Sequence, residues 1–194
     1  MLFLILGPSG VGKGTQIELL KKRHSEFEFP KSVTTRKMRP RESQGNPYHF
    51  ISDKTFDQHI ADHDFLEWAE VHQAARYGTL RKPIEDALKN EKTVIKELDI
   101  QGLLNIKKTV AKGHHELIGK MLRSIFLMPP SEEVLIQRIT RRGGIKEVEL
   151  KARLESAKKE MVQAKLCDQL IPTAELDTPE VVYKKIEQII VPKS

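Results

Sequence analysis

The sequence contains a single cysteine, Cys167, and this scarcity excludes an internal disulfide framework. It also lacks any apolar run near the roughly 20 residues that a membrane-spanning helix needs. The apolar opening at residues 1–6 is too short for the core of a signal peptide and has no basic flank. We therefore expect a protein of a reducing compartment, the cytoplasm, with no membrane partner.

Low-complexity tracts and internal repeats are absent from the sequence, and aromatic residues make up only 6% of the 194 residues. This length and ordinary composition favour one globular domain. The net charge of +6 suits nucleic acid, an acidic membrane surface or a small phosphorylated ligand. Because no concentrated basic stripe with interleaved aromatic residues occurs, nucleic acid is not the expected partner.

The apolar pattern predicts an α/β protein. Strands are expected as short, mostly apolar runs, at residues 2–6, 48–51, 93–98, 124–128 and 168–172. Helices are expected at residues 15–24, from an N-cap at Asp53, from an N-cap at Ser131 to Arg142, at about 150–164 and from Pro179 onward. Buried strands separated by helices imply a three-layer fold with a parallel sheet. Residues 30–80 break this alternation, which predicts a small inserted α+β unit.

A glycine-rich loop follows the first strand and opens a helix. Its residues are Gly7, Pro8, Ser9, Gly10, Val11, Gly12, Lys13, Gly14 and Thr15. Glycines allow backbone N–H groups to turn inward as a nest for phosphate, and the helix N-terminus adds partial positive charge. The pattern and its context predict an ATP site in which Lys13 reaches the terminal phosphates and acts in catalysis.

One position of this loop departs from the usual pattern. The residue after the lysine usually supplies the hydroxyl that ligates Mg²⁺, but here it is Gly14, and the hydroxyl comes one position later at Thr15. We expect a Mg²⁺ cofactor that arrives with ATP and lies near Thr15 and Asp99, held partly by water. No fixed set of protein ligands follows from the sequence.

Basic residues gather in the segment SVTTRKMRPRE, residues 32–42, and Tyr48 follows it. Guanidinium forks and a phenol hydroxyl suit a phosphate monoester, because bidentate contacts hold a dianion in a fixed orientation. Arg36 and Arg39 are the candidate forks. A solvated basic loop fits the same pattern, and the residues alone leave both interpretations open.

Ordered motifs along nearly the whole chain carry a family resemblance. They are GPSGVGKGT, SVTTRKMRPRE, YHFIS, FLEWAEVH, YGT, ELDIQG, PPS and RRG. In order and spacing they are similar to the motifs of guanylate kinases, which transfer a phosphoryl group from ATP to GMP. The resemblance implies a single domain with a P-loop NTPase core at residues 1–30, 81–140 and 160–194, a GMP-binding insert at about 31–80, and a short helical lid at about 141–155.

The resemblance also implies roles for single residues. The phosphate of GMP would be bound by Ser32, Arg36, Arg39 and Tyr48, with Tyr77 adjoining. Guanine would be recognised by Glu67 and Thr79, with Asp99 beside the base and the metal region. Guanine offers N1–H and an amine as donors and O6 as an acceptor, which a carboxylate and a hydroxyl complement. Adenine offers an acceptor at N1, so a site of this kind rejects it.

For the transfer step, the resemblance implies arginines on the helices that flank the lid. We expect Arg138 and Arg153 on the phosphates and Arg142 nearer the adenine, with Arg141 able to replace one of them. The pair at 143–144, two glycines, would be the hinge of a lid that closes and excludes water. Exposed helix arginines more often serve solubility, so these roles depend on the resemblance.

Three stretches depart from the family pattern. Residues 102–123 are longer than usual and carry His114-His115, expected in a solvated loop; Arg76 precedes the YGT motif; and Thr173 stands where an asparagine is typical. The expected activity is phosphorylation of GMP, and of dGMP, in purine nucleotide metabolism, by a monomer or a homodimer. Two alternatives stay open, a non-catalytic guanylate-kinase-like interaction module and a kinase for another phosphorylated acceptor.

Overall fold

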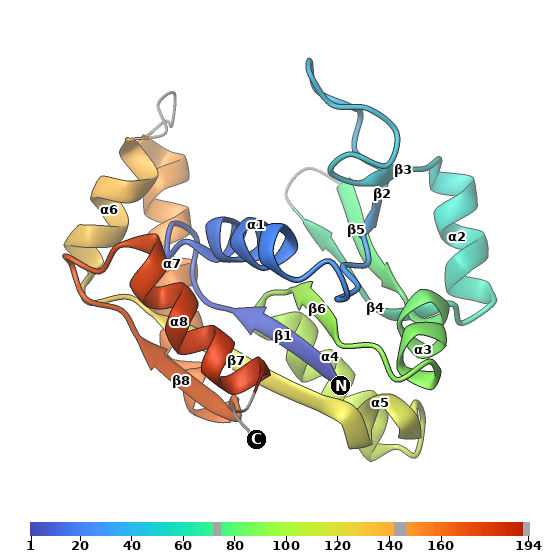
Figure 1. The fold of residues 1–194 in the computed structure, drawn as a ribbon. Coiled ribbons are helices and arrows are strands. Elements are labelled where there is room, and N and C mark those ends of the chain that lie inside the picture. The colour runs from blue at the N-terminus through green and yellow to red at the C-terminus, as the bar shows by residue number, and fades with distance from the viewer. Residues whose placement is uncertain (72–74, 142–146, 192–194) are drawn as a thin grey trace.

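The computed structural model describes residues 1–71, 75–141 and 147–191 (Figure 1). Its larger sheet is entirely parallel, with the strand order β6-β1-β7-β8. These strands are β1 (Leu2–Leu6), β6 (Val94–Glu97), β7 (Leu122–Met128) and β8 (Gln169–Pro172). The prediction of an α/β fold with a parallel sheet is confirmed; the bounds of β1 are those predicted, and the bounds of the other three strands differ by one or two residues.

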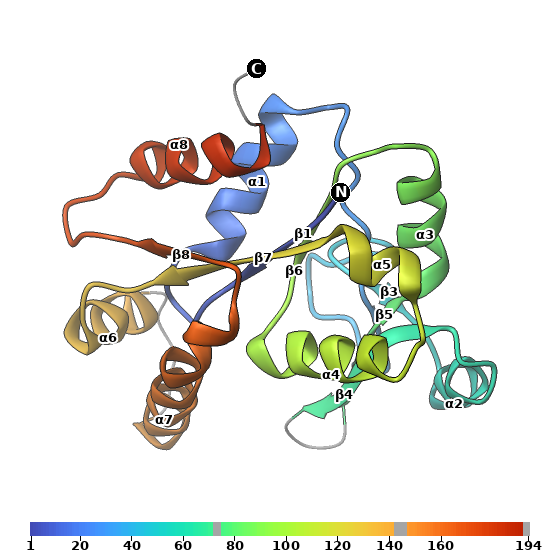
Figure 2. The same cartoon turned by 90° about the horizontal axis from the view of Figure 1, so that it is seen from below.

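Both faces of this sheet are covered by helices, as a parallel sheet requires. In Figure 2, α1 (Lys13–Arg23) and α8 (Pro179–Ile190) lie on one face and α4 (Ile100–Ala111) lies on the other. Successive residues of β1 point to opposite faces, so Phe3 and Ile5 join the core beneath α1 and α8, while Leu2, Leu4 and Leu6 join the core of α4. The helices α3 (Arg81–Lys89) and α5 (Glu116–Met121) complete this second core.

A smaller mixed sheet, with the strand order β3-β2-β5-β4, is built wholly from residues 33–80. Its strands are β2 (Val33–Thr34), β3 (His49–Phe50), β4 (Phe65–Val71) and β5 (Ala75–Leu80). Helix α2 (Asp53–Ala61) packs on it through a small core of Val33, Phe56 and Phe65. The prediction of Asp53 as the N-cap of this helix is wrong. The cap is Ser52, whose hydroxyl accepts from the backbone N–H of Thr55.

Two further helices lie beside the phosphate loop at the other end of the molecule (Figure 1). They are α6 (Glu132–Thr140) and α7 (Glu147–Gln163), and a 3₁₀ turn at Ala164–Leu166 follows. Ser131 caps α6 as predicted, because its hydroxyl accepts from the N–H of Val134. The helix ends at Thr140, two residues before the predicted end. The predicted hinge at 143–144 and the predicted site residue Arg142 lie outside the described residues.

The long stretch at residues 102–123 is mostly helical. It contains most of α4 and all of α5, and His114 and His115 lie between them. His115 adopts a left-handed backbone (φ 55°) at the N-cap of α5. In the part of the chain that the structure describes, no helix combines the length and the apolar character needed to cross a membrane.

Candidate active site

The glycine-rich loop connects β1 to α1 and forms a nest at the helix N-terminus. Gly7 has φ 139°, and a Cβ placed on it would lie 2.7 Å from the carbonyl oxygen of Leu127, so only glycine fits there. Gly12 is the N-cap of α1 with φ 109°. The first N–H groups of α1 therefore face the loop without intrahelical partners, which is the arrangement that binds phosphate.

Lys13 is the first residue of α1, and its side chain extends back toward the start of the loop. It donates to the carbonyl oxygen of Gly7 at 2.6 Å and lies 3.8 Å from the carboxylate of Glu97 at the end of β6. Its side chain is only 14% exposed. It also donates to the carbonyl oxygen of Pro8 at 3.3 Å, and a cation held by two carbonyls and one distant carboxylate can exchange these contacts for the oxygens of a triphosphate.

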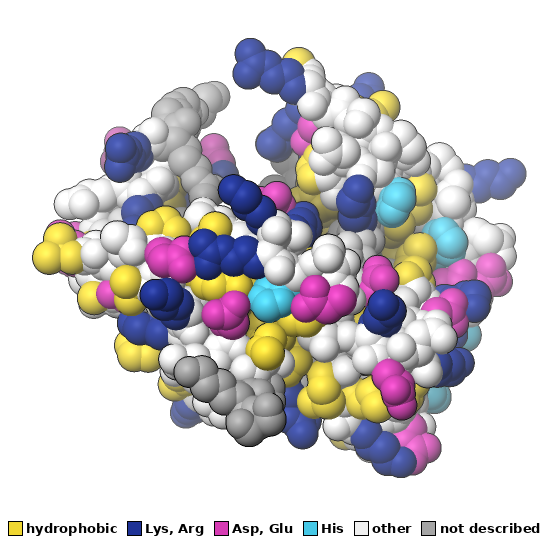
Figure 3. Space-filling model, in the orientation of Figure 1, with side chains coloured by type: hydrophobic (Ala, Val, Ile, Leu, Met, Phe, Trp, Pro, Cys, Tyr) yellow, Lys and Arg dark blue, Asp and Glu magenta, His cyan; other side chains and the backbone are white. Residues whose placement is uncertain are grey.

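Two arginines reach the same loop from α6 and α7. Arg138 directs a guanidinium nitrogen toward the carbonyl oxygen of Val11 at 3.4 Å, and Arg153 approaches the hydroxyl of Ser9 at 3.4 Å while it pairs with Glu149 at 2.6 Å. Positive charge thus converges on the loop from three elements. Figure 3 shows a hollow between this side of the molecule and the smaller sheet, bordered by Lys and Arg side chains.

A cavity of about 490 Å³ separates the phosphate loop from the smaller sheet. Its wall on the core side includes Lys13, Gly14 and Asp99, and its wall on the other side includes Ser32, Tyr48, Glu67 and Tyr77. Two residues of the predicted donor loop and most residues of the predicted acceptor site therefore face one space. Such a volume accommodates a small nucleotide.

A hydrogen-bond acceptor in the wall of this cavity, Glu67, lies beside a buried hydroxyl, that of Thr79. Glu67 of β4 stands directly opposite Thr79 of β5 in the antiparallel register, so both side chains share one face of the sheet. Thr79 is 1% exposed, and its hydroxyl oxygen has no hydrogen-bond partner among the described residues. Burial raises the pKa of the Glu67 carboxyl above its usual range. An unpaired buried hydroxyl beside a desolvated carboxylate complements the polar edge of a bound base.

Arg36 lies beside the cavity and is already hydrogen-bonded. Its guanidinium forms a fork with both oxygens of Glu42, at 2.9 and 3.0 Å, and its Nε donates to the hydroxyl of Tyr77 at 3.1 Å. These hydrogen bonds hold the pKa of Glu42 below its usual range. Glu42 thus fills the fork that an acceptor phosphate would use. The ring of Tyr48 packs edge-on against Tyr77, with centroids 5.5 Å apart.

Arg39, the second predicted fork, is not part of the cavity wall. Its side chain is exposed, while its backbone N–H donates to Glu42 at 2.7 Å. Glu42 therefore organises both ends of the arginine segment. Sequence reasoning did not assign it a role, although its position three residues after Arg39 suits a turn contact.

The carboxylates expected near a metal lie on the core side of the cavity. Asp99 is the N-cap of α4, and its Oδ1 accepts from the N–H of Gly102 at 2.7 Å. Glu97, which sequence reasoning missed, lines the same wall near Lys13. Thr15 is exposed on the first turn of α1, and a Cβ added to Gly14 would meet nothing within 4 Å. Oxygen groups are thus available for a cation that takes most of its ligands from phosphate and water.

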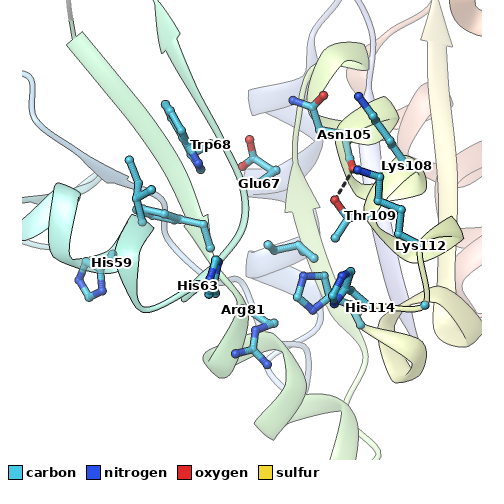
Figure 4. A pocket seen from close by; sticks show the side chains of 15 residues that line it. His59, His63, Glu67, Trp68, Arg81, Asn105, Lys108, Thr109, Lys112 and His114 are labelled. Atoms are coloured by element: carbon cyan, nitrogen blue, oxygen red, sulfur yellow. Dashed lines mark hydrogen bonds between the residues drawn. The ribbon is translucent and has the colours of Figure 1, made fainter.

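A second cavity, of about 960 Å³, lies behind the smaller sheet, between β4 and α4. Figure 4 shows Glu67 facing this space from β4, with Asn105 and Lys108 of α4 on its far side. None of the phosphate-loop residues lines it. Despite its size, this cavity is therefore not where a phosphoryl group could pass between two ligands.

Comparison with known proteins gives a consistent result. Residues 1–192 match the family model described as guanylate kinase. The guanylate kinase of Cutibacterium acnes is 38% identical over 174 residues, 90% of this chain and 83% of that protein. The guanylate kinase of Clostridium perfringens strain 13 is 39% identical over 190 residues, 98% of this chain and 82% of that protein. The crystal structure of guanylate kinase from Anaplasma phagocytophilum superposes with a TM-score of 0.70 at 26% identity, covering 98% of this chain and 84% of that one.

Proposed function

The chain belongs to the guanylate kinase family and is a nucleoside monophosphate kinase, and from this we propose that it transfers the γ-phosphoryl group of ATP to GMP. The reaction gives ADP and GDP. The observation that carries the proposal is Glu67, which lines a cavity that also opens onto Lys13 of the phosphate loop and stands opposite the buried Thr79, as a site for a base would require.

ATP would place its phosphates in the loop formed by residues 7–15. The backbone nest binds the β-phosphate region, and Lys13 leaves its contact with Gly7 to reach the terminal phosphates. Arg138 and Arg153, which already touch the loop, supply charge to the group in transfer. Arg142 is assigned the adenine side from the resemblance alone.

GMP would enter from the side of the smaller sheet. Its phosphate takes the place of Glu42 at the Arg36 fork and receives hydrogen bonds from Ser32, Tyr48 and Tyr77. Arg39 would have to turn inward to take part, because its side chain is exposed. A phosphate dianion is a stronger partner for a guanidinium than a single carboxylate, so this exchange favours the bound state.

The base would be recognised at Glu67 and Thr79. The Glu67 carboxylate accepts from N1–H and the amine of guanine, and the Thr79 O–H donates to O6, which gives this buried hydroxyl a hydrogen bond. We assign none of the described residues to the 2′-hydroxyl of the ribose, and we therefore propose that dGMP is also accepted. Asp99 lies beside this region and orients the base or the metal hydration shell.

Mg²⁺ would be bound with ATP near Thr15, which is exposed on α1, and near Glu97 and Asp99, which line the cavity. It would supply positive charge that neutralises the phosphates. The division into a core, an acceptor-binding insert at 31–80 and a lid at 141–155 is part of the proposal. It is supported by the separate sheet and core formed within residues 33–80. The oligomeric state and the cellular location stay predictions.

The experiment is a coupled ADP-release assay with ATP and a panel of GMP, dGMP, AMP, CMP and UMP. We expect turnover with GMP and dGMP, and a kcat/KM for AMP lower by about 10⁴ because its N1 would meet the Glu67 lone pairs. Omission of Mg²⁺ should abolish turnover. Equal rates with AMP and GMP would contradict the base assignment, and no turnover with any acceptor would contradict the activity.

A further inference from the structure

A buried lysine lies in the wall of the acceptor cavity, and the mechanism above does not use it. Lys96 of β6 is 6% exposed and lines the cavity with Ser32 and Glu67. Its ammonium donates to the hydroxyl of Ser32 at 2.6 Å and to the carbonyl oxygen of Pro30 at 3.0 Å. An ammonium has three N–H donors, so these contacts leave one donor without a partner among the described residues.

This position is an unfavourable one for a charged side chain. Val94 and Ile95, in the same strand, belong to the apolar core, and the partner of Lys96 in β1 is Leu4. Taking an ammonium out of water costs free energy that two neutral acceptors repay only in part. An apolar residue would serve the fold at least as well. The lysine is therefore better explained by the ligand that the cavity binds than by the stability of the sheet.

We propose that Lys96 is a positioning residue of the acceptor site, which orients Ser32 for the acceptor phosphate and keeps the nearby Glu67 carboxylate charged for guanine. This inference rests on the proposed function. The inference goes beyond the proposed function because it assigns the positive charge in the acceptor pocket to a residue of the larger sheet, whereas the proposed function uses residues of the insert.

The phosphate half of the proposal follows from the direction of one hydrogen bond. Because the Ser32 oxygen accepts from Lys96, its own O–H is free to donate to a phosphate oxygen. The ammonium is itself buried and then lies one hydroxyl away from a dianion, so its charge is weakly screened. Without Lys96, the Ser32 hydroxyl loses both its orientation and its polarisation.

The base half follows from the charges around Glu67. Burial raises the pKa of this carboxyl, and the negative charge of Asp99 acts in the same direction, whereas the adjacent Thr79 and the positive charge of Lys96 oppose the rise. A charged Glu67 only accepts hydrogen bonds, as guanine requires. A protonated Glu67 would present an O–H donor to the base and could pair with N1 of adenine. Lys96 thus protects the discrimination between the two purines.

The pH dependence of acceptor binding follows from the same geometry. Burial lowers the pKa of Lys96 to about 8, against the attraction of Glu67 from β4 and Glu97 from β6 and with the repulsion of Lys21 from α1. The protonated lysine favours a dianionic ligand, and the ligand in turn raises this pKa. The KM for GMP should therefore be lowest below pH 8 and should rise above it as Lys96 loses its proton.

The experiment compares Lys96→Met, which keeps length without charge, with Lys96→Gln, which keeps a donor without charge. Lys82→Met is the matched control, because Lys82 lies on the exposed side of α3 with its side chain 81% exposed. For Lys96→Met at pH 7 we expect the KM for GMP to rise about tenfold or more, with the KM for ATP unchanged and the melting temperature equal or higher. Lys96→Gln should lie between Lys96→Met and the wild type.

Two further readouts separate positioning from a structural role. The rise of the GMP KM above pH 8 should disappear in both Lys96 variants, and the ratio of kcat/KM for GMP to that for AMP should fall in both. A wild-type GMP KM in Lys96→Met, or parallel losses for ATP and GMP with a lower melting temperature, would overturn the inference. Either result would overturn only the role of Lys96, because the wild type would still phosphorylate GMP. Absence of that turnover would instead contradict the proposed function.

Discussion

The donor end and the acceptor end of the cleft are built on different principles. The donor end is a run of consecutive residues, 7–15, in which backbone N–H groups are arranged by a strand, a turn and a helix start. The acceptor end collects side chains from Ser32 to Asp99, contributed by both sheets and the segments between them. The first site is a local consequence of chain geometry, whereas the second exists only after the two sheets have packed.

This difference determines how each end responds to substitution. At the donor end, the backbone carries most of the contacts, so few side chains matter beyond the glycines, Lys13 and the two arginines that reach the loop, Arg138 and Arg153. At the acceptor end, each side chain is held by others, as Arg36 is held by Glu42 and Tyr77. Changes there should therefore affect one substrate selectively and should be coupled to one another.

The largest effect is expected from Lys13→Ala at the donor end. The substitution removes the mobile charge that reaches the terminal phosphates, and we expect kcat to fall on the order of 10³-fold. The fold should persist, because the main partner of Lys13 is a backbone carbonyl. Steady-state kinetics with circular dichroism measures both, and Lys22→Ala on the exposed side of α1 is the control. Undiminished turnover would show that ATP does not use this loop.

Next in size is Glu67→Gln at the acceptor end. The amide presents N–H donors to the N1–H or amine of guanine, so kcat/KM for GMP should fall by about 2–3 kcal/mol of transition-state binding, or roughly 30- to 150-fold. The KM for ATP should not change. Glu70→Gln on the same strand is the control, because Glu70 is exposed. If Glu67→Gln retained wild-type kinetics with GMP, the base would be recognised elsewhere.

The same contrast explains what the sequence could predict. Apolar runs at residues 2–6 and 124–128 predicted the parallel sheet, because strands buried on both faces leave a continuous apolar signal. The phosphate loop was predictable for a similar reason, since its glycines and Lys13 are close in sequence. The two-residue strand Val33–Thr34 is too short for any periodicity, and it forms only between β5 and the strand His49–Phe50, which lies within the predicted run 48–51.

At the site, the sequence could not predict contacts between segments. Lys96 is separated by 64 residues from Ser32, and nothing local indicates that they meet. Its only signal is a charged residue inside an otherwise buried strand. The prediction of Asp53 as a helix cap failed because Asp53 and Ser52 are both good caps, and backbone geometry decides in favour of Ser52.

A smaller effect is expected from Arg39→Ala, which tests how far the acceptor end rearranges. Because the Arg39 side chain is exposed in the structure, it contributes only if binding draws it inward. We expect the KM for GMP to rise about five- to tenfold, with the KM for ATP and the melting temperature unchanged. Lys37→Ala, exposed in the same segment, is the control. An unchanged GMP KM would leave Arg36 as the sole fork for the phosphate.

The smallest effect is expected from Gly14→Ser, which restores a hydroxyl directly after the loop lysine. A Cβ at this position meets nothing within 4 Å and the backbone needs no positive φ, so the substitution is tolerated. Serine also has a higher helix propensity than glycine by about 0.5 kcal/mol, and the melting temperature should rise slightly. If the new hydroxyl ligates Mg²⁺, the Mg²⁺ concentration for half-maximal rate should fall about three- to tenfold.

Thr15→Val tests the alternative that the Thr15 hydroxyl is the Mg²⁺ ligand, because valine keeps the shape of threonine and removes its hydroxyl. A raised Mg²⁺ requirement in Thr15→Val, together with no effect of Gly14→Ser, would make the displaced Thr15 the ligand. The donor end would then depend on a side chain at a position that the usual loop pattern does not use. The opposite result, a response to Gly14→Ser alone, would show that the ion occupies the usual place beside α1 and that water fills the missing ligand position in the wild type.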